Sequence, residues 1–145
     1  MIVRAAVAAD IAAAAGVAAR SYRGAFAGIL ADAALDLRTP EFFAARFRES
    51  LDLVMVAESN GAVIGFSVMT HRHIDMLFVD PGRQGAGVGH ALLEDAEHRG
   101  ANSLECFRAN FAARRFYERA GWRLAHAYAR PFANAEHEFV RYEKR

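Results

Sequence analysis

The amino-acid sequence predicts an α/β fold in which helices flank a mixed, mostly antiparallel sheet. Apolar runs rich in β-branched and aromatic residues alternate with stretches of helical periodicity. An Asn60-Gly61 step separates two of the β-rich runs, which is typical of a tight hairpin. A glycine-rich turn joins a further β-rich run directly to an amphipathic stretch, as in many α/β proteins that bind phosphates.

The first third of the chain predicts one strand and two helices. A short apolar strand over residues 1–5 precedes Asp10, an N-cap candidate for a helix over residues 11–27. This helix is rich in alanine, which favours helix and allows close packing on a sheet. Three phenylalanines at helical spacing predict a second helix over residues 39–50.

The remainder predicts a meander, two further helices and a closing hairpin. The predicted strands span residues 53–58, 62–70, 73–79, 103–107, 122–129 and 138–143. One predicted helix follows the glycine-rich turn. The other spans residues 110–120 and ends at Gly121, the residue type preferred just after a helix.

Length and composition favour one ordinary globular domain. The 145 residues have a net charge of +1, which gives no reason to expect a nucleic acid or an acidic membrane as partner. Cys106 is the single cysteine, so an internal disulfide and a multi-cysteine metal site are excluded and a reducing, cytoplasmic compartment is compatible. The alanine-rich opening is interrupted by charges and is too short for a membrane span.

The glycine-rich turn is the strongest indication of function. Residues 84–89 read Gln-Gly-Ala-Gly-Val-Gly, so several main-chain N–H groups can converge on an anion at a helix start. A P-loop is excluded because Gly87 is followed by Val88 and Gly89, and the only lysine is Lys144. A dinucleotide-binding fingerprint is excluded because its last glycine position is His90.

Two ordered motifs resemble those of the GCN5-related N-acetyltransferases. Residues 84–89 match the family's Gln/Arg-x-x-Gly-x-Gly/Ala loop, and residues 110–122 are similar to its Asn-x-x-Ala-x-x-Phe-Tyr-x-x-x-Gly-Phe/Trp helix. The resemblance is specific from about residue 74 to residue 122. It implies a three-layer fold of that family and a single acetyl-CoA-dependent N-acetyltransferase domain over residues 1–145, with acetyl-CoA as cosubstrate, no metal and a homodimer as a plausible assembly.

The resemblance also implies where the cosubstrate binds. The strand over residues 73–79 would carry a bulge and part from its neighbour, leaving main-chain groups of Leu77, Phe78 and Val79 free for the cofactor amides and the acetyl carbonyl. An N–H near Leu77 would act as an oxyanion donor, an effect worth about 2–4 kcal/mol. The diphosphate would be held by Gln84, Gly85, Ala86, Gly87, Val88, Gly89 and His90. Asn110 is an N-cap candidate, and the resemblance adds a contact with the cofactor amides.

Tyr117 is the candidate general acid for the departing thiolate. A phenol with a pKa of about 10 lies only one to two units above a thiol, so the proton transfer costs little and tuning could remove that cost. The alternative is that Tyr117 is packed in an apolar stripe of its helix. The match to the motif favours the catalytic interpretation.

Asp75 is the leading candidate for the general base, since an alkylammonium substrate must lose a proton before it attacks. The alternative is an ion pair with an arginine such as Arg72, or a solvated position. His71, His73 and Glu105 are further candidates. A metal held by the two histidines lacks a convincing third ligand.

The acceptor, a small-molecule or peptide amine, would be recognised by the first helices and the loop between them. Tyr22, Phe26, Ile29 and Leu30 can line a pocket there, although each is equally suited to the core. Residues 130–134 are predicted to be a loop that closes the other side.

Two alternatives concern the chemistry. Cys106 could carry the acyl group, but no histidine is placed to activate it, so a small buried side chain is favoured. A different class of function, a non-catalytic acyl-CoA-binding or interaction module, and a protein that binds another phosphate ligand remain as alternatives.

Overall fold

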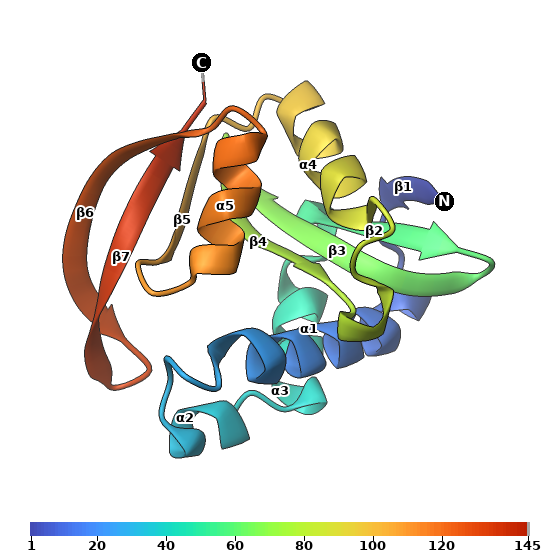
Figure 1. Cartoon of the computed structure of the whole chain (residues 1–145). Coiled ribbons are helices and arrows are strands. Elements are labelled where there is room, and N and C mark those ends of the chain that lie inside the picture. The colour runs from blue at the N-terminus through green and yellow to red at the C-terminus, as the bar shows by residue number, and fades with distance from the viewer. Residues whose placement is uncertain (145) are drawn as a thin grey trace.

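The computed structural model describes residues 1–144, which form a seven-stranded sheet in the order β1-β2-β3-β4-β5-β7-β6 (Figure 1). Neighbouring strands are antiparallel except β4 and β5, which are parallel, so the predicted mixed, mostly antiparallel sheet is confirmed. The strands are Ile2–Ala5 (β1), Val54–Ser59 (β2), Ala62–Thr70 (β3), His73–Val79 (β4), Ser103–Phe107 (β5), Arg123–Phe132 (β6) and Ala135–Glu143 (β7).

Helices cover both faces of the sheet and make three layers (Figure 1). One face packs against Ile11–Phe26 (α1), Asp32–Asp36 (α2) and Pro40–Glu49 (α3) through a large core rich in aromatic rings. The other face packs against Val88–His98 (α4) and Phe111–Arg119 (α5). Within residues 1–144, no helix is both long and apolar enough to cross a membrane.

Local sequence signals account for most element boundaries. Asn60 and Gly61 have φ values of 52° and 79°, the left-handed pair that a two-residue hairpin turn requires. Thr39 caps α3 by accepting a hydrogen bond from the Phe42 N–H at 3.1 Å. Gly121, with φ 92°, ends the α5 segment as predicted.

Asp10 occupies the N-cap position of α1, but the predicted side-chain capping bond is absent among the described residues. Its carboxylate instead accepts hydrogen bonds from the Val7 N–H at 2.8 Å and from Arg4 at 2.8 and 3.0 Å. Arg4 also bonds Glu58 on β2, so this buried carboxylate joins β1, β2 and the start of α1. The Asp10 carboxylate therefore binds the Arg4 guanidinium on β1 in place of the N–H groups at the start of α1, because a charge-assisted hydrogen bond is the stronger one.

The prediction of a loop over residues 130–134 is wrong. Residues 130–132 continue β6, and Ala133 and Asn134, both at positive φ, make the turn into β7. Pro131 is tolerated because β6 is an edge strand, where a missing N–H need not break the ladder. The short helix α2 lies in a stretch for which no element was predicted.

The sheet divides between β4 and β5. These strands pair only at His73↔Ser103 and Ile74↔Leu104, after which they part. The gap between them widens toward the carboxyl end of β4, where the glycine-rich turn and α5 lie (Figure 1). The predicted separation of this strand from its neighbour is therefore present in the structure.

Candidate active site

The glycine-rich turn leads into α4 through left-handed backbone. Gly85 and Gly87 have φ values of 88° and 81°, a conformation that residues with a side chain rarely adopt. Gly87 is the N-cap of α4, and residues 81–87 are all exposed. A Cβ atom added at Gly85 or Gly87 would meet nothing within 4 Å, so the turn presents open space beside the helix N-terminus. The unpaired N–H groups and the positive end of the helix dipole make this a place for an anion.

Close packing fixes where α4 begins. A Cβ at Gly89 would lie 3.3 Å from the Phe116 ring on α5, so glycine lets the two helices approach. A Cβ at Gly65 on β3 would lie 2.9 Å from the Phe78 carbonyl oxygen and 3.1 Å from Leu92. The turn is therefore positioned by α5 on one side and by the sheet beneath it.

The β4 strand carries a bulge at Asp75, which has no partner on β3 because Val68 pairs with Met76 and Met69 with Ile74. Beyond the bulge, the Asp80 N–H donates to the Ile64 carbonyl on β3 at 2.8 Å. Main-chain direction alternates along an extended strand, so the groups of Phe78 face β3 and those of Leu77 and Val79 face the gap. Of the three residues predicted to offer main-chain groups, Phe78 is thus turned away.

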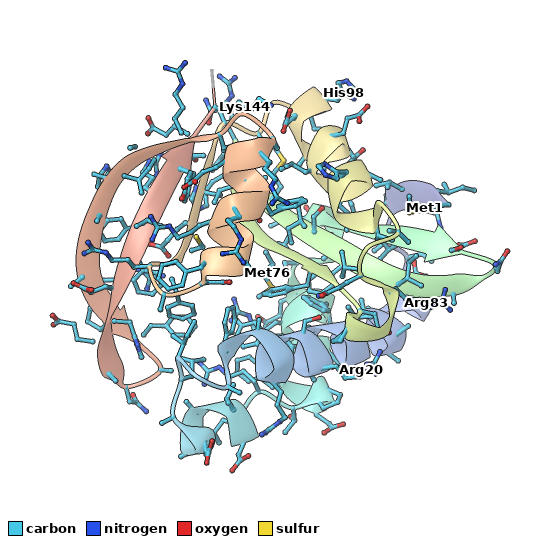
Figure 2. All side chains as sticks on the ribbon, in the orientation of Figure 1. Met1, Arg20, Met76, Arg83, His98 and Lys144 are labelled. Atoms are coloured by element: carbon cyan, nitrogen blue, oxygen red, sulfur yellow. The ribbon has the colours of Figure 1, made fainter. Side chains whose placement is uncertain are left out.

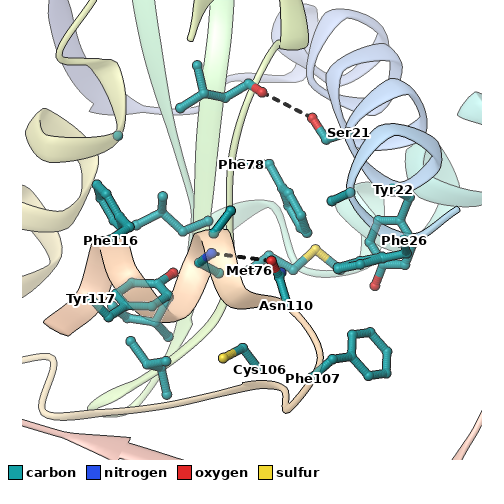
Figure 3. A pocket seen from close by; sticks show the side chains of 18 of the residues that line it. Ser21, Tyr22, Phe26, Met76, Phe78, Cys106, Phe107, Asn110, Phe116 and Tyr117 are labelled. Atoms are coloured by element: carbon teal, nitrogen blue, oxygen red, sulfur yellow. Dashed lines mark hydrogen bonds between the residues drawn. The ribbon is translucent and has the colours of Figure 1, made fainter. Parts of the chain in front are cut away.

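A cleft of about 960 Å³ occupies the gap between β4 and β5. Figure 3 shows many of its side chains, including Met76 on β4, and Figure 2 shows where Met76 lies in the whole molecule. The glycine-rich turn contributes Gln84, Gly85, Gly87, Val88, Gly89 and His90, but not Ala86. The cleft also includes Asp75, Leu77, Phe78, Val79, Asn110 and Tyr117, so the structure brings the other predicted site residues together.

Tyr117 is a buried residue of α5 that lines the cleft. Its ring packs against Phe116, Trp122 and Tyr142, so the packing interpretation holds for the ring. Its hydroxyl forms no hydrogen bond with a described residue. Burial raises the pKa of Tyr117, which is the reverse of the expected tuning. The phenol therefore keeps its proton at neutral pH and is a weak acid.

Asp75 is exposed and lines the cleft from the bulge. It accepts a hydrogen bond from the Thr70 hydroxyl rather than from Arg72, which donates to the Gly100 carbonyl at 2.9 Å. No described cation pairs with Asp75. His71 and His73 are not among the residues that line the cleft. His73 instead shares a hydrogen bond of 2.8 Å with Ser103.

Glu105 lies in the cleft, but its carboxylate is already engaged by Arg130 and Tyr128. Burial acts to raise its pKa, yet hydrogen bonds from Arg130 and Tyr128 outweigh burial and lower the pKa of Glu105. A carboxylate held in this way is a poor proton acceptor. Among the candidate bases, Asp75 is the carboxylate at the cleft with an unengaged charge.

Cys106 faces the cleft near Tyr117 (Figure 3). Burial raises the pKa of its thiol to about 12. A protonated, half-buried thiol is unsuited to nucleophilic attack, which supports the interpretation as a small buried side chain.

Asn110 is the N-cap of α5. Its Oδ1 accepts a hydrogen bond from the Ala113 N–H at 3.2 Å, which confirms the capping role. Its side-chain NH₂ donates to no described residue, and because Asn110 lines the cleft this group is available to a ligand.

Tyr22 and Phe26 line the cleft, whereas Ile29 and Leu30 pack in the core away from it. Other cleft residues escaped the sequence analysis, notably Ser21, Phe107 and Phe139. Ser21 donates to the Val79 carbonyl at 3.2 Å. Alternation along a strand could indicate that Phe107 and Phe139 share a face, but no local signal shows that this face meets a ligand.

The residues present suit a ligand with both phosphates and amides. An open glycine turn stands at a helix N-terminus, and main-chain groups of Leu77 and Val79 lack a strand partner. Within residues 1–144, no group of three His, Cys, Asp or Glu residues is placed to hold a metal ion.

Comparison with known proteins assigns the family. Residues 20–145 match the sequence profile of the acetyltransferase (GNAT) domain, and the chain belongs to this family. The chain resembles, over nearly its whole length, the PaiA N-acetyltransferase of Thermoplasma acidophilum in complex with coenzyme A, with a TM-score of 0.72 and 18% identity over 99% of this chain and 98% of that one. The apo form of YjaB from Escherichia coli gives a TM-score of 0.74 and 18% identity over 99% and 97%. These likenesses confirm the three-layer fold.

Two curated relatives are similar in sequence over part of the chain. One is the blasticidin-S acetyltransferase of Streptomyces morookaense, 37% identical in a 73-residue alignment that covers 47% of this chain. The other is the peptidyl-lysine N-acetyltransferase YjaB of Escherichia coli (strain K12), 29% identical in a 98-residue alignment that covers 59% of this chain. The matched region spans about half of the first relative, 54%, and 67% of the second.

Proposed function

We propose that residues 1–145 act as one acetyl-CoA-dependent N-acetyltransferase domain that acetylates a primary amine by direct attack in a ternary complex. The observation that carries this proposal is the parting of β4 and β5 beside the glycine turn that opens α4. Membership of the GNAT family and the activities named for its relatives support it. The acceptor would be a small-molecule or peptide amine, in a cytoplasmic setting that suits a lone thiol.

Acetyl-CoA would bring the activated acetyl group, and the chain would hold it at both ends. The N–H groups of residues 84–89 and the start of α4 would bind the diphosphate. Leu77 and Val79 would bond the cofactor amides, and the Leu77 N–H would stabilise the oxyanion as the amine attacks. The Asn110 NH₂ would contact the same amides.

Tyr117 would donate the proton to the departing sulfur. Its raised pKa makes the donor weak, but burial also raises the pKa of the neighbouring Cys106 thiol, and the same burial would raise the pKa of a CoA thiol released in the cleft. The Tyr117 hydroxyl forms no hydrogen bond with a described residue and is therefore available to a ligand.

Asp75 would accept the proton of the acceptor ammonium, directly or through water. Its exposure and its place on the bulge, next to Met76 in the lining of the cleft, support this role. The carboxylate would also attract the ammonium before it is deprotonated.

A thiol-release assay with acetyl-CoA and a panel of primary amines tests the proposal. We expect turnover on at least one amine, and a fall in kcat of about 100-fold in Tyr117→Phe, the lower end of the range for general acids. The KM for acetyl-CoA should change little, because the phenol is not needed to hold the diphosphate. CoA binding without turnover on any amine would favour the non-catalytic module, and failure of CoA to bind would contradict the cofactor assignment. Sedimentation of the purified protein would check the proposed homodimer.

A further inference from the structure

The two faces of the cleft differ in character. The glycine turn, α4 and α5 line it on one face of the sheet, and α1 with the β6–β7 hairpin lines it on the other. A cosubstrate held by the glycine turn therefore leaves the α1 face to the acceptor. The ring-bearing residues on that face come from α1, β4, β5, β6 and β7 and comprise Tyr22, Phe26, Phe78, Phe107, Phe132 and Phe139.

These rings form one continuous aromatic wall. Phe107 lies 4.9 Å from Phe26, 5.5 Å from Phe132 and 4.8 Å from Phe139, measured between ring centroids. Phe78 and Phe132 are only half-buried, so the wall offers ring surface to an occupant. Aromatic side chains favour another flat apolar group by burial and by offset or edge contacts.

Arg130, the arginine among the described cleft residues, is already neutralised, and Arg38, which lies 5.5 Å from the Phe132 ring, is not among the cleft residues. Arg130 donates to Glu105 through Nε, at 3.0 Å, and through Nη2, and its guanidinium lies 4.1 Å from the centroid of the Phe139 ring. A carboxylate or phosphate on the acceptor would have to displace Glu105 to gain Arg130. Such an anion would otherwise lie in the aromatic cleft with no free arginine or lysine among the described cleft residues, which is unfavourable.

The other charge on this side is negative. Asp75 is exposed at the cleft and has no cation partner among residues 1–144, and His90 lies on the opposite side with the glycine turn. Asp75, Glu105 and Arg130 together leave one net negative charge, which suits a cationic amine without an acidic group.

From these charges and contacts we infer that the acceptor is an arylalkylamine: a primary amine joined by a short alkyl chain to an aromatic ring, with no carboxylate or phosphate. Its ammonium lies toward Asp75 and its ring lies against the aromatic wall. This inference rests on the proposed function and names the substrate class of the same site. The reaction forms the amide C–N bond and breaks the thioester C–S bond. The ammonium loses two protons: Asp75 accepts the first before attack and releases it to solvent, and the second leaves nitrogen as the amide forms and replaces the proton that Tyr117 gives to sulfur.

The test compares phenethylamine with phenylalanine, butylamine, spermidine and a lysine peptide in the thiol-release assay. Phenethylamine should have the highest kcat/KM, exceeding that of phenylalanine by about tenfold or more, since the added carboxylate has no partner. Turnover of the peptide, spermidine or phenylalanine at an equal or higher kcat/KM would overturn the inference and leave the proposed function intact. Turnover of none of the amines would overturn both.

A matched pair of variants locates the ring. Phe132 and Phe42 are both half-buried, and both lie beside the Arg38 guanidinium, at 5.5 and 5.3 Å, but only Phe132 is among the cleft residues. Phe132→Ala should raise the KM for phenethylamine about fivefold, as expected for a lost aromatic contact, while Phe42→Ala leaves it unchanged. Equal effects in the two variants would overturn the placement.

A third variant tests whether the ion pair with Glu105 keeps Arg130 from binding a carboxylate on the acceptor. Glu105→Gln removes the charge that engages Arg130, so the ratio of kcat/KM for phenylalanine to that for phenethylamine should rise about fivefold or more. The ratio is unaffected by a general loss of activity. An unchanged or lower ratio would show that Arg130 does not govern exclusion of the carboxylate.

Discussion

At the scale of single residues, the backbone conformation of Gly87 is the most direct target. Its φ of 81° is left-handed, and alanine there costs about 1–2 kcal/mol. Gly87→Ala should therefore raise the KM for acetyl-CoA by up to about tenfold, because the strain opposes the turn that holds the diphosphate. Gly82→Ala is the control, since its added Cβ meets nothing within 4 Å and its φ is not positive. Equal KM values in the two variants would contradict the proposal that this turn holds the diphosphate.

Cys106 gives a second residue-scale prediction, from its raised pKa of about 12. A thiol reacts with iodoacetamide as the thiolate, so folded protein should be alkylated far more slowly at mildly alkaline pH than a free thiol of pKa about 8.5. The rate should rise as the pH approaches the raised value. Intact-mass spectrometry would follow the reaction, with protein unfolded in urea as the control that must react fully. Rapid alkylation of the folded chain at neutral pH would restore the acyl-carrying alternative.

At the scale of elements, the junction of β1, β2 and α1 depends on a charged cluster. Hydrogen bonds from Arg4 lower the pKa of Asp10. A lowered folded-state pKa contributes stability that is fully present above the unfolded pKa of about 3.9 and is lost as the pH falls from there through the lower folded-state pKa. The free energy of unfolding should thus decline more steeply on acidification for the native chain than for Asp10→Asn. Urea denaturation at several pH values would measure this, with the exposed Asp52→Asn as a control that keeps the native slope.

The elements also show what local sequence determines. The strands over residues 62–70, 73–79 and 103–107 have the predicted bounds because alternation and turn residues are local properties. The helix α2 has only five residues, too few for a periodic pattern. The continuation of β6 through Pro131 depends on its being an edge strand, which is decided by pairing with β7.

At the scale of the whole molecule, the site arises from contacts that no single segment encodes. The motifs located the glycine turn, Asn110 and Tyr117, because their chemistry is read from neighbouring residues. The aromatic wall joins rings from five elements, and the Arg130–Glu105 pair spans β6 and β5. The raised pKa of Tyr117 follows from burial among α4, α5, β5 and β7 residues, which sequence spacing does not reveal.

The division of the sheet into β1–β4 and β5–β7–β6, joined by two residue pairs, leads to a last prediction. The amides of Leu77 and Val79 face the gap, whereas those of Phe78 and Asp80 are directed to β3. In the free protein, Leu77 and Val79 should therefore exchange hydrogen faster than their neighbours. Saturating CoA should slow the exchange of Leu77 and Val79, since a bound ligand replaces the missing strand, and leave Phe78 and Asp80 little changed beyond the general stabilisation that binding brings.

Residue-resolved exchange by NMR would show this alternation directly, with Val56 in the β2–β3 pairing as the reference for general stabilisation. A uniform slowing along β4 would mean that CoA acts only by stabilising the fold. Fast exchange at Phe78 instead of Leu77 would mean that the Phe78 N–H, not the Leu77 N–H, faces the gap. Leu77 would then no longer be a candidate oxyanion donor. Because the two outcomes differ at adjacent residues, the experiment tests the geometry of the gap independently of which amine is the acceptor.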